Sequence, residues 1–344
     1  MTSYLTADSL WWNGRLHAAA PSAPPSSAGV ALRIADDGNT SLVHISDIPD
    51  SSAMRRLPGT LLPGLVDAHV HSGLVDLATV RAGGIAGVWD LGSTPATVAA
   101  LTAVPGMPRI RYAGPFLIPP GGYPSDRSWA PRGSWREIYS PDDATAAVGE
   151  VVDCGATLVK VTAHAGGPLL PKATLAAVVS AAHTAGLPVV VHAEGPGTVA
   201  AAVESGADWL AHTPWTSRLD PGLIRACADR VGWISTLDIH GWGEPTPELT
   251  TALGNLRDFL AAGGRVRYGT DLGNGPLPPA VNRREIRNLQ AAGLTPDDIL
   301  LAMTGDDVTW VPGGLDLDPA RFAGSLATAR VLDDRVRPRG TGAA

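Results

Sequence analysis

Six side chains that could bind metal ions lie at the ends of short apolar runs, each about as long as a β-strand. They are His69, His71, Lys160, His192, His212 and Asp271. Imidazole nitrogens and carboxylate oxygens are ligands that suit zinc, with manganese, iron and nickel as alternatives. If all six side chains meet at one end of a parallel sheet, they could hold two ions about 3.5–4 Å apart with a shared hydroxide between them.

His69 and His71 follow the apolar stretch 61–68. Residues two apart on a strand point to the same face, so both imidazoles could reach one ion. The alternative is two surface histidines side by side by chance. The apolar run 61–68 indicates a buried strand, which favours metal ligands over surface histidines at these two positions.

Lys160 lies in the apolar run Thr-Leu-Val-Lys-Val, in a chain whose other lysine is Lys172. A buried, unpaired ammonium is costly, so the pKa of this amine should fall and leave it nucleophilic. Such an amine could add carbon dioxide, and the carbamate could bridge two metal ions. The alternative is a lysine that reaches the mouth of the sheet and pairs with a carboxylate.

His192 and His212 end two consecutive apolar runs at equivalent positions. A single core histidine is usually satisfied by hydrogen bonds, but this repetition favours a shared role. Asp271 ends the last run, where it could cap the following helix or face the same site as the histidines.

The chain between residues 61 and 305 alternates apolar runs with Ala- and Leu-rich helical stretches, as a parallel α/β fold requires. We expect helices over 142–154, 172–185 and 248–262, with Gly155, Gly186 and Gly263 as stop signals. Eight strands are expected over 65–71, 87–91, 110–116, 158–163, 189–192, 209–212, 233–239 and 266–271. This number and length predict a (β/α)8 TIM barrel, whose active sites lie at the strand C-terminal ends.

The two terminal segments differ from this rhythm. The residues from Trp11 to Gly14 suggest a strand and a turn, and residues 30–34 and 41–45 suggest short strands. The composition of the segment after residue 305 is not typical of a helix. We therefore expect residues 1–60 and 306–344 to form a small β-domain beside a barrel at 61–305.

Composition excludes several classes of function. The formal net charge of -7 would repel phosphate backbones, so nucleic acid is not expected as a partner. No apolar run approaches the roughly 18 residues that span a membrane, and no basic-then-apolar leader is present, so we expect a cytoplasmic protein. Its partner is then a small-molecule substrate, and a homo-oligomer is the base-rate expectation.

The stretch Pro63-Gly64-Leu65-Val66-Asp67-Ala68-His69-Val70-His71, taken with Gly269-Thr270-Asp271, resembles the amidohydrolase superfamily. The Pro-Gly-Leu-Val-Asp lead resembles the branch of imidazolonepropionase-like proteins and Xaa-Pro dipeptidases. The stretch 114–123 looks like the loop of that branch after its third strand, and 287–303 resembles its final helices.

This resemblance implies that His69, His71 and Asp271 bind one ion, that His192 and His212 bind a second, and that carboxylated Lys160 bridges them. It also implies that Asp271 moves the proton from the bridging water to the leaving group. The expected activity is hydrolysis of an amide, peptide, cyclic amide or lactone bond by a metal-bridging hydroxide, with zinc as the expected metal.

Further residues near the strand ends are candidates for catalysis and substrate binding. His240 is the preferred carbonyl-polarising group, and the expected substrate-binding residues are Tyr123, His164, Trp215 and Trp242. Alternatively, His164 and His240 are ordinary polar loop residues. Trp215 and Trp242 could instead pack loops against helices.

Two other interpretations remain open. Glu194, two residues after His192, is typical of mononuclear deaminases and imidazolone-type ring hydrolases. A barrel that has lost catalysis and serves as a scaffold is the alternative from a different class, since a fold does not prove a function.

Overall fold

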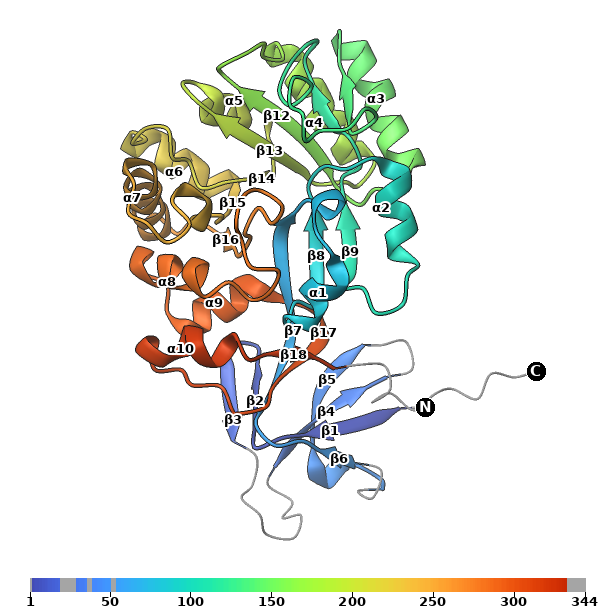
Figure 1. Ribbon diagram of the computed structural model, residues 1–344, viewed down its shortest axis with the longest axis vertical. Coiled ribbons are helices and arrows are strands. Elements are labelled where there is room, and N and C mark those ends of the chain that lie inside the picture. The colour runs from blue at the N-terminus through green and yellow to red at the C-terminus, as the bar shows by residue number, and fades with distance from the viewer. Residues whose placement is uncertain (1, 19–28, 36–38, 51–53, 333–344) are drawn as a thin grey trace, which may run out of the picture.

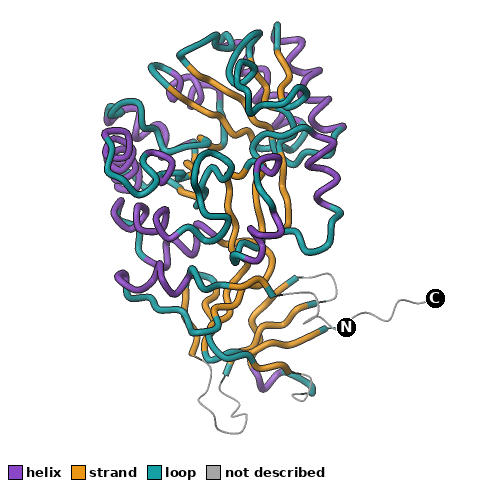
Figure 2. Tube along the Cα trace, in the orientation of Figure 1, coloured by secondary structure: helices purple, strands orange, loops and turns teal. Residues whose placement is uncertain are grey.

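The computed structural model describes residues 2–18, 29–35, 39–50 and 54–332. It has a region of parallel strands flanked by helices and a β-rich region below it (Figure 1). In the tube view the helices lie outside the parallel strands (Figure 2). The fold is therefore mixed α/β, as the sequence predicts, and no helix of the described residues is long and apolar enough to cross a membrane.

The parallel strands correspond to the predicted ones with two larger differences, described below. In addition, the strand expected over 266–271 ends at Arg267, so Asp271 lies four residues beyond it. The parallel strands are β7 (Thr60–Val70), β8 (Gly87–Asp90), β9 (Arg109–Tyr112), β10 (Phe116–Ile118), β11 (Trp135–Glu137), β12 (Val159–His164), β13 (Val189–Glu194), β14 (Trp209–Leu210), β15 (Gly232–Ile234) and β16 (Val266–Arg267). Hydrogen bonds join them in the order β7-β8-β9 and β11-β10-β12-β13-β14-β15-β16.

The first difference is that the strand expected over 110–116 is two strands, β9 and β10. The backbone turns at Gly114, whose φ of +68° favours glycine, and Pro115 has no N–H for a ladder. The second difference is that the strand expected over 233–239 ends at Ile234. A 3-10 turn follows at η4 (Asp238–His240), after Thr236 has taken a φ of +46°.

The helices follow the strands along the chain. They are α1 (Leu77–Ala82), α2 (Pro95–Thr102), α3 (Pro141–Asp153), α4 (Lys172–Thr184), α5 (Thr198–Ser205), α6 (Pro221–Arg230), α7 (Pro247–Ala261), α8 (Arg283–Ala292), α9 (Pro296–Met303) and α10 (Pro319–Leu326). The three helices predicted from sequence, α3, α4 and α7, are confirmed within two residues at each end. Ser140 and Thr246 begin two of them by accepting hydrogen bonds from backbone N–H groups of the first turn.

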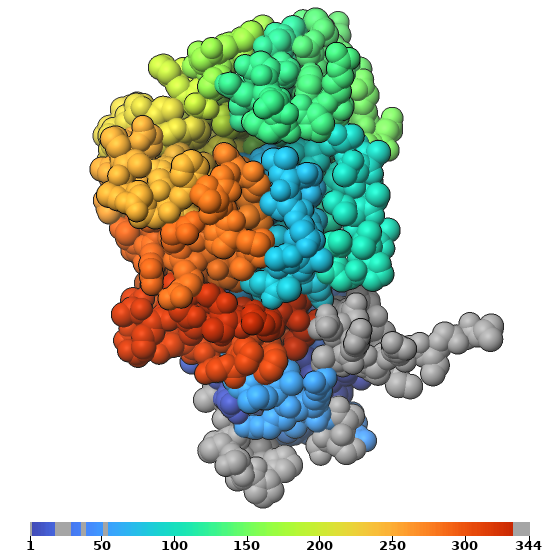
Figure 3. All heavy atoms as spheres, viewed as in Figure 1, coloured from blue at the N-terminus to red at the C-terminus, as the bar shows by residue number. Residues whose placement is uncertain are grey.

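The β-rich region contains strands from both ends of the chain. One sheet has the order β5 (Thr40–His44), β4 (Val30–Ile34), β1 (Ser3–Thr6), β6 (Met54–Arg56). A second has the order β18 (Arg330–Val331), β17 (Thr304–Val311), β7, β2 (Ser9–Trp12), β3 (Arg15–Ala18). In the space-filling view, the part of the chain drawn red lies between the blue N-terminal part and the cyan and orange parts above it (Figure 3).

Residues after 305 differ from the expectation of a non-helical segment, because α10 lies there. Asp318 caps this helix by accepting a hydrogen bond from the Ala320 N–H, and Pro319 occupies its first turn. Phe322 and Leu326 bury its inner face. Residues 333–344, which belong to the predicted β-domain, lie outside the described residues.

Candidate metal centre

His69 and His71 lie where β7 ends, and each is held through one ring nitrogen. The Nδ1 of His69 lies 2.9 Å from the Ala211 carbonyl oxygen, and the Nδ1 of His71 lies 3.2 Å from that of Gly92. A carbonyl only accepts, so both Nδ1 atoms donate, and in the neutral ring the Nε2 atom then carries the lone pair that can bind a metal ion. This is the arrangement by which proteins orient metal-binding imidazoles.

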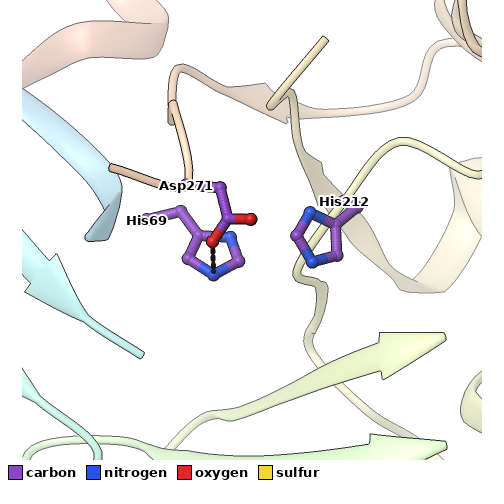
Figure 4. A group of neighbouring side chains, drawn as sticks. All are labelled: His69, His212 and Asp271. Carbon is purple, nitrogen blue, oxygen red and sulfur yellow. Dashed lines mark ion pairs between the residues drawn. The ribbon is translucent and has the colours of Figure 1, made fainter. Parts of the chain in front are cut away.

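Asp271 lies opposite these two imidazoles. Its Oδ1 is 3.0 Å from the His69 Nε2 and 3.1 Å from the His71 Nε2. Figure 4 shows Asp271 beside His69, with His212 across from them. Burial alone would raise the pKa of Asp271, but the surrounding histidines hold it well below its usual value. Its backbone has a φ of +59°, so tertiary contacts impose an unfavourable conformation here.

The donor set formed by His69, His212 and Asp271 fits a metal ion. One ligand atom from each lies within 4.8 Å of the others, and all three residues are buried. Asp271 Oδ1 is buried without a hydrogen-bond partner in the described residues. A buried, ionised oxygen is costly unless positive charge lies beside it, either on protonated imidazoles or on a cation held between them.

His192 and His212 extend this cluster toward β13 and β14. Their rings lie 5.0 Å apart, centre to centre. The Nδ1 of His212 lies 2.9 Å from the Thr236 hydroxyl, which leaves its Nε2 free. The Nε2 of His192 lies 3.0 Å from Glu194 Oε2, and His164 Nδ1 approaches the same oxygen to 2.9 Å. These contacts hold the pKa of Glu194 down at about 2, so this carboxylate is ionised.

Lys160 is buried on β12 and points into the same space. It is 1% exposed, and burial lowers the pKa of its amine to about 7, against the opposing effect of Asp271 and Asp90. Within the described part of the chain, its amine has no hydrogen bond and no ion pair with a carboxylate. The pairing considered as an alternative from sequence is therefore not seen, and a large fraction of the amine is neutral at neutral pH.

All six candidate ligands line one cavity of about 490 Å³. Aromatic side chains form much of its remaining wall, and Glu194, Arg127 and Asn274 add polar groups; the aromatic residues are Phe116, Tyr123, Trp129 and Trp215. A space of this size, with few polar groups among apolar walls, is typical of a small-molecule site.

Three of the residues expected to act on substrate do not line this cavity. The His164 ring lies 5.2 Å from that of Tyr123, and the His240 ring packs 5.1 Å from that of Trp215. Burial lowers the pKa of His240 to about 4. Trp242 is 45% exposed and packs against Gly275, whose loop does line the cavity.

Two buried carboxylates that support the cluster were overlooked in the sequence. Asp90 accepts hydrogen bonds from the N–H groups of Ser72 and Gly92, and the carbonyl of Gly92 in turn holds His71. Asp67 accepts hydrogen bonds from the N–H groups of His69 and of Thr270, the residue before Asp271. Asp90 lies at the end of β8, so the strand-end criterion that identified the other residues could have found it.

Comparisons with known proteins give structural likeness only. No family model and no curated protein matches the chain. A Xaa-Pro dipeptidase with methionine bound in its active site is similar at 17% identity and a TM-score of 0.76, over 99% of this chain and 100% of that one.

Two further structures are similar over most of their length. Ochratoxinase from A. niger matches at 18% identity and a TM-score of 0.74, over 95% of this chain and 93% of that one. A putative prolidase from Bifidobacterium longum matches at 20% and 0.71, over 95% and 91%. The chain therefore adopts the fold of these amidohydrolase-like structures, and the resemblance inferred from sequence is confirmed at the level of the fold.

Proposed function

We propose that this protein is a metal-dependent amidohydrolase that cleaves an amide, peptide, cyclic amide or lactone bond of a small molecule. The observation that carries the proposal is the convergence of four imidazoles, the buried carboxylate of Asp271 and the buried amine of Lys160 on a single cavity. The names of the similar structures, a dipeptidase, an ochratoxinase and a prolidase, support hydrolysis as the reaction class.

We place this chemistry at the mouth of a closed (β/α)8 barrel. β9 pairs with β8 and β10 pairs with β12, so together they take the place of one barrel strand. On the opposite side, Leu272 bonds to β7 through its N–H to the His69 carbonyl at 3.1 Å and its carbonyl to the His71 N–H at 2.8 Å. We assign residues 61–305 to this barrel, and 1–60 with 306–344 to a small β-domain.

The chain's own residues have distinct tasks in the proposed centre. His69, His71 and Asp271 would hold one zinc ion, His192 and His212 a second, and carboxylated Lys160 would bridge them. When bound, the ions supply an acidified water and polarise the substrate carbonyl. Asp271 would accept the proton of that water and return it to the leaving nitrogen. The aromatic wall would exclude solvent and position the substrate.

A mononuclear centre is the second candidate, and Glu194 favours it. Its Oε2 lies 3.0 Å from the Nε2 of His192. A second ion bound through this nitrogen would require Glu194 to rotate away, whereas an ion bound through the Nδ1 of His192 would leave the contact in place. In a mononuclear deaminase or ring hydrolase it would stay and orient the substrate.

Metal content of purified protein separates these candidates, and Lys172 provides a matched control because it is the other lysine of the chain and is exposed. We expect about two equivalents of metal in the wild type and in Lys172→Ala, a sharp fall in Lys160→Ala, and hydrolysis in a screen of amides, dipeptides and lactones. About one equivalent, unchanged in Lys160→Ala, would favour the mononuclear centre. If no variant contains metal after growth in metal-replete medium, the result would favour the third interpretation, a scaffold protein without catalysis.

A further inference from the structure

A second cavity adjoins the proposed metal centre on the side of His71. It has a volume of about 330 Å³ and lies at the start of α2. Four residues border both cavities: His71, Leu74, Phe116 and Trp129. The two spaces are therefore neighbours divided by a mostly apolar partition.

Local geometry fixes this partition. The Phe116 ring packs directly over the α-carbon of Gly92, where a Cβ would lie 2.1 Å from the ring, so only glycine fits there. The Trp129 ring lies 6.2 Å from that of Phe116 and 6.0 Å from that of His71. Trp129 therefore lies where a ligand of either cavity can contact it.

Two exposed apolar side chains lie on this partition. Leu74 is 44% exposed and Trp129 is 37% exposed, although most large apolar side chains of the barrel region are buried. Clustered exposed apolar side chains beside a cavity mark a surface that a ligand covers. A ligand that spans both cavities would bury both residues.

Hydroxyl groups line the far side of the second cavity. Thr94, Thr97 and Ser128 line it, and none of these hydroxyls has a hydrogen-bond partner among the described residues. Apart from His71, no titratable side chain of the described residues lines it. This lining offers hydrogen bonds but no charge to pair, so it suits an uncharged group with amide or hydroxyl functions.

We propose that the second cavity is a substrate subsite that binds an uncharged, peptide-like segment continuing beyond the scissile bond. This inference rests on the proposed function, because it places the scissile bond at the metal centre. Substrates would then be two-part amides, with one part among Tyr123 and Trp215 and the other extending past Trp129. A single-residue amide would use only the metal cavity.

Thr97→Phe tests the subsite by filling it from an exposed position of α2 that lies outside the metal cavity. Thr102→Phe is a matched control, since Thr102 lies on the same helix and lines neither cavity. The first probe is acetohydroxamate, which reports the metal centre alone. The second is a hydroxamate carrying one additional uncharged glycine amide unit.

We expect zinc-loaded wild type to bind the extended hydroxamate about tenfold more tightly than acetohydroxamate in calorimetry. Thr97→Phe should abolish this gain while leaving acetohydroxamate binding unchanged, and Thr102→Phe should keep it. Equal affinity for both probes in the wild type, or a gain that survives Thr97→Phe, overturns the subsite.

A metal-free measurement separates this inference from the proposed function. N-acetylglycine N-methylamide carries the uncharged peptide unit without a metal-binding group, and saturation-transfer NMR detects its binding. A signal present in the wild type and Thr102→Phe but absent in Thr97→Phe supports the subsite, even if acetohydroxamate fails to bind and the metal centre is refuted. No signal in the wild type refutes the subsite, whatever the metal content.

Discussion

Asp67 on β7 and Thr270 in the segment after β16 join the two parts of the chain that carry the first candidate metal site. The Thr270 hydroxyl donates to Asp67 Oδ2 at 2.6 Å, and the Thr270 N–H donates to Oδ1 at 3.0 Å. The same Oδ1 accepts the N–H of His69 at 3.0 Å. One buried carboxylate therefore sets the separation between His69 and Asp271.

Removing this carboxylate should weaken both the fold and the metal site. We expect Asp67→Ala to lower the free energy of unfolding by about 2–4 kcal/mol, because buried N–H groups lose their acceptor. Zinc affinity should fall about 10- to 100-fold, as for other residues that orient ligands. Urea unfolding and zinc competition titration measure the two effects.

Thr270→Val is the graded control, because it removes only the hydroxyl bond. We expect Thr270→Val to lower the free energy of unfolding by about 1 kcal/mol and to reduce zinc affinity less than Asp67→Ala does. Unchanged zinc affinity in Asp67→Ala would refute the positioning role.

The chain contains two lysines, which makes the proposed carbamate directly observable. After exchange with ¹³C-bicarbonate, zinc-loaded wild type should show one protein-bound carbamate signal by NMR. Lys160 is buried with a pKa of about 7, whereas Lys172 is exposed and paired with Glu204 at 2.6 Å. The signal should vanish in Lys160→Ala and persist in Lys172→Ala; a signal that survives in Lys160→Ala would refute the assignment.

Asp271→Asn should separate proton transfer from folding. The amide keeps the size of the side chain but cannot accept a proton at neutral pH, so kcat should fall by about 10²- to 10⁴-fold. Asp306→Asn, at an exposed position of β17, should leave kcat unchanged. Zinc content is measured alongside, and an active Asp271→Asn enzyme with full metal content would exclude Asp271 as the base.

The two tryptophans predicted to bind substrate should differ in effect. Trp215 lines the cavity, with its ring 5.3 Å from that of His212, whereas Trp242 is exposed and lies outside the lining. Trp215→Ala should raise KM about tenfold or more for the substrate found in the screen, since a buried aromatic contact is lost. An equal or larger increase in Trp242→Ala would contradict this placement.

The ligand positions could be predicted from sequence because each follows an apolar run that ends at the same edge of a parallel sheet. The positions of residues in loops could not be predicted, because loops have no regular periodicity of apolar and polar residues. His240 falls in a 3-10 turn behind Trp215 rather than at a strand end, and Thr236 adopts its positive φ where its hydroxyl meets His212.

The helix at 319–326 was missed for a different reason. Its start signal, Asp318-Pro319, is present in the sequence, but Gly313 and Gly314 shortly before it suggested a loop. The helix depends on Phe322 and Leu326, which are buried in the main core, and a single sequence does not show such long-range packing.

Glu285 should make the stability of the metal-free protein depend on pH. Burial raises the pKa of this carboxyl from 4.5 to about 8, and its Oε2 accepts the Asp238 N–H at 2.7 Å. The folded state therefore keeps a proton that the unfolded chain has released. The stability that this proton contributes is fully present below pH 4.5 and is lost as the pH rises through about 8.

Glu285→Gln should remove this dependence, because its amide oxygen can still accept the Asp238 N–H and carries no proton to lose. Between about pH 5 and pH 9, the free energy of unfolding of the wild type should fall relative to that of the variant by an amount on the order of a few kcal/mol. Urea unfolding of metal-free protein across this range measures the difference, with Glu248→Gln at an exposed site as the control. Parallel pH profiles for the wild type and Glu285→Gln would show that Glu285 is ionised in the folded protein.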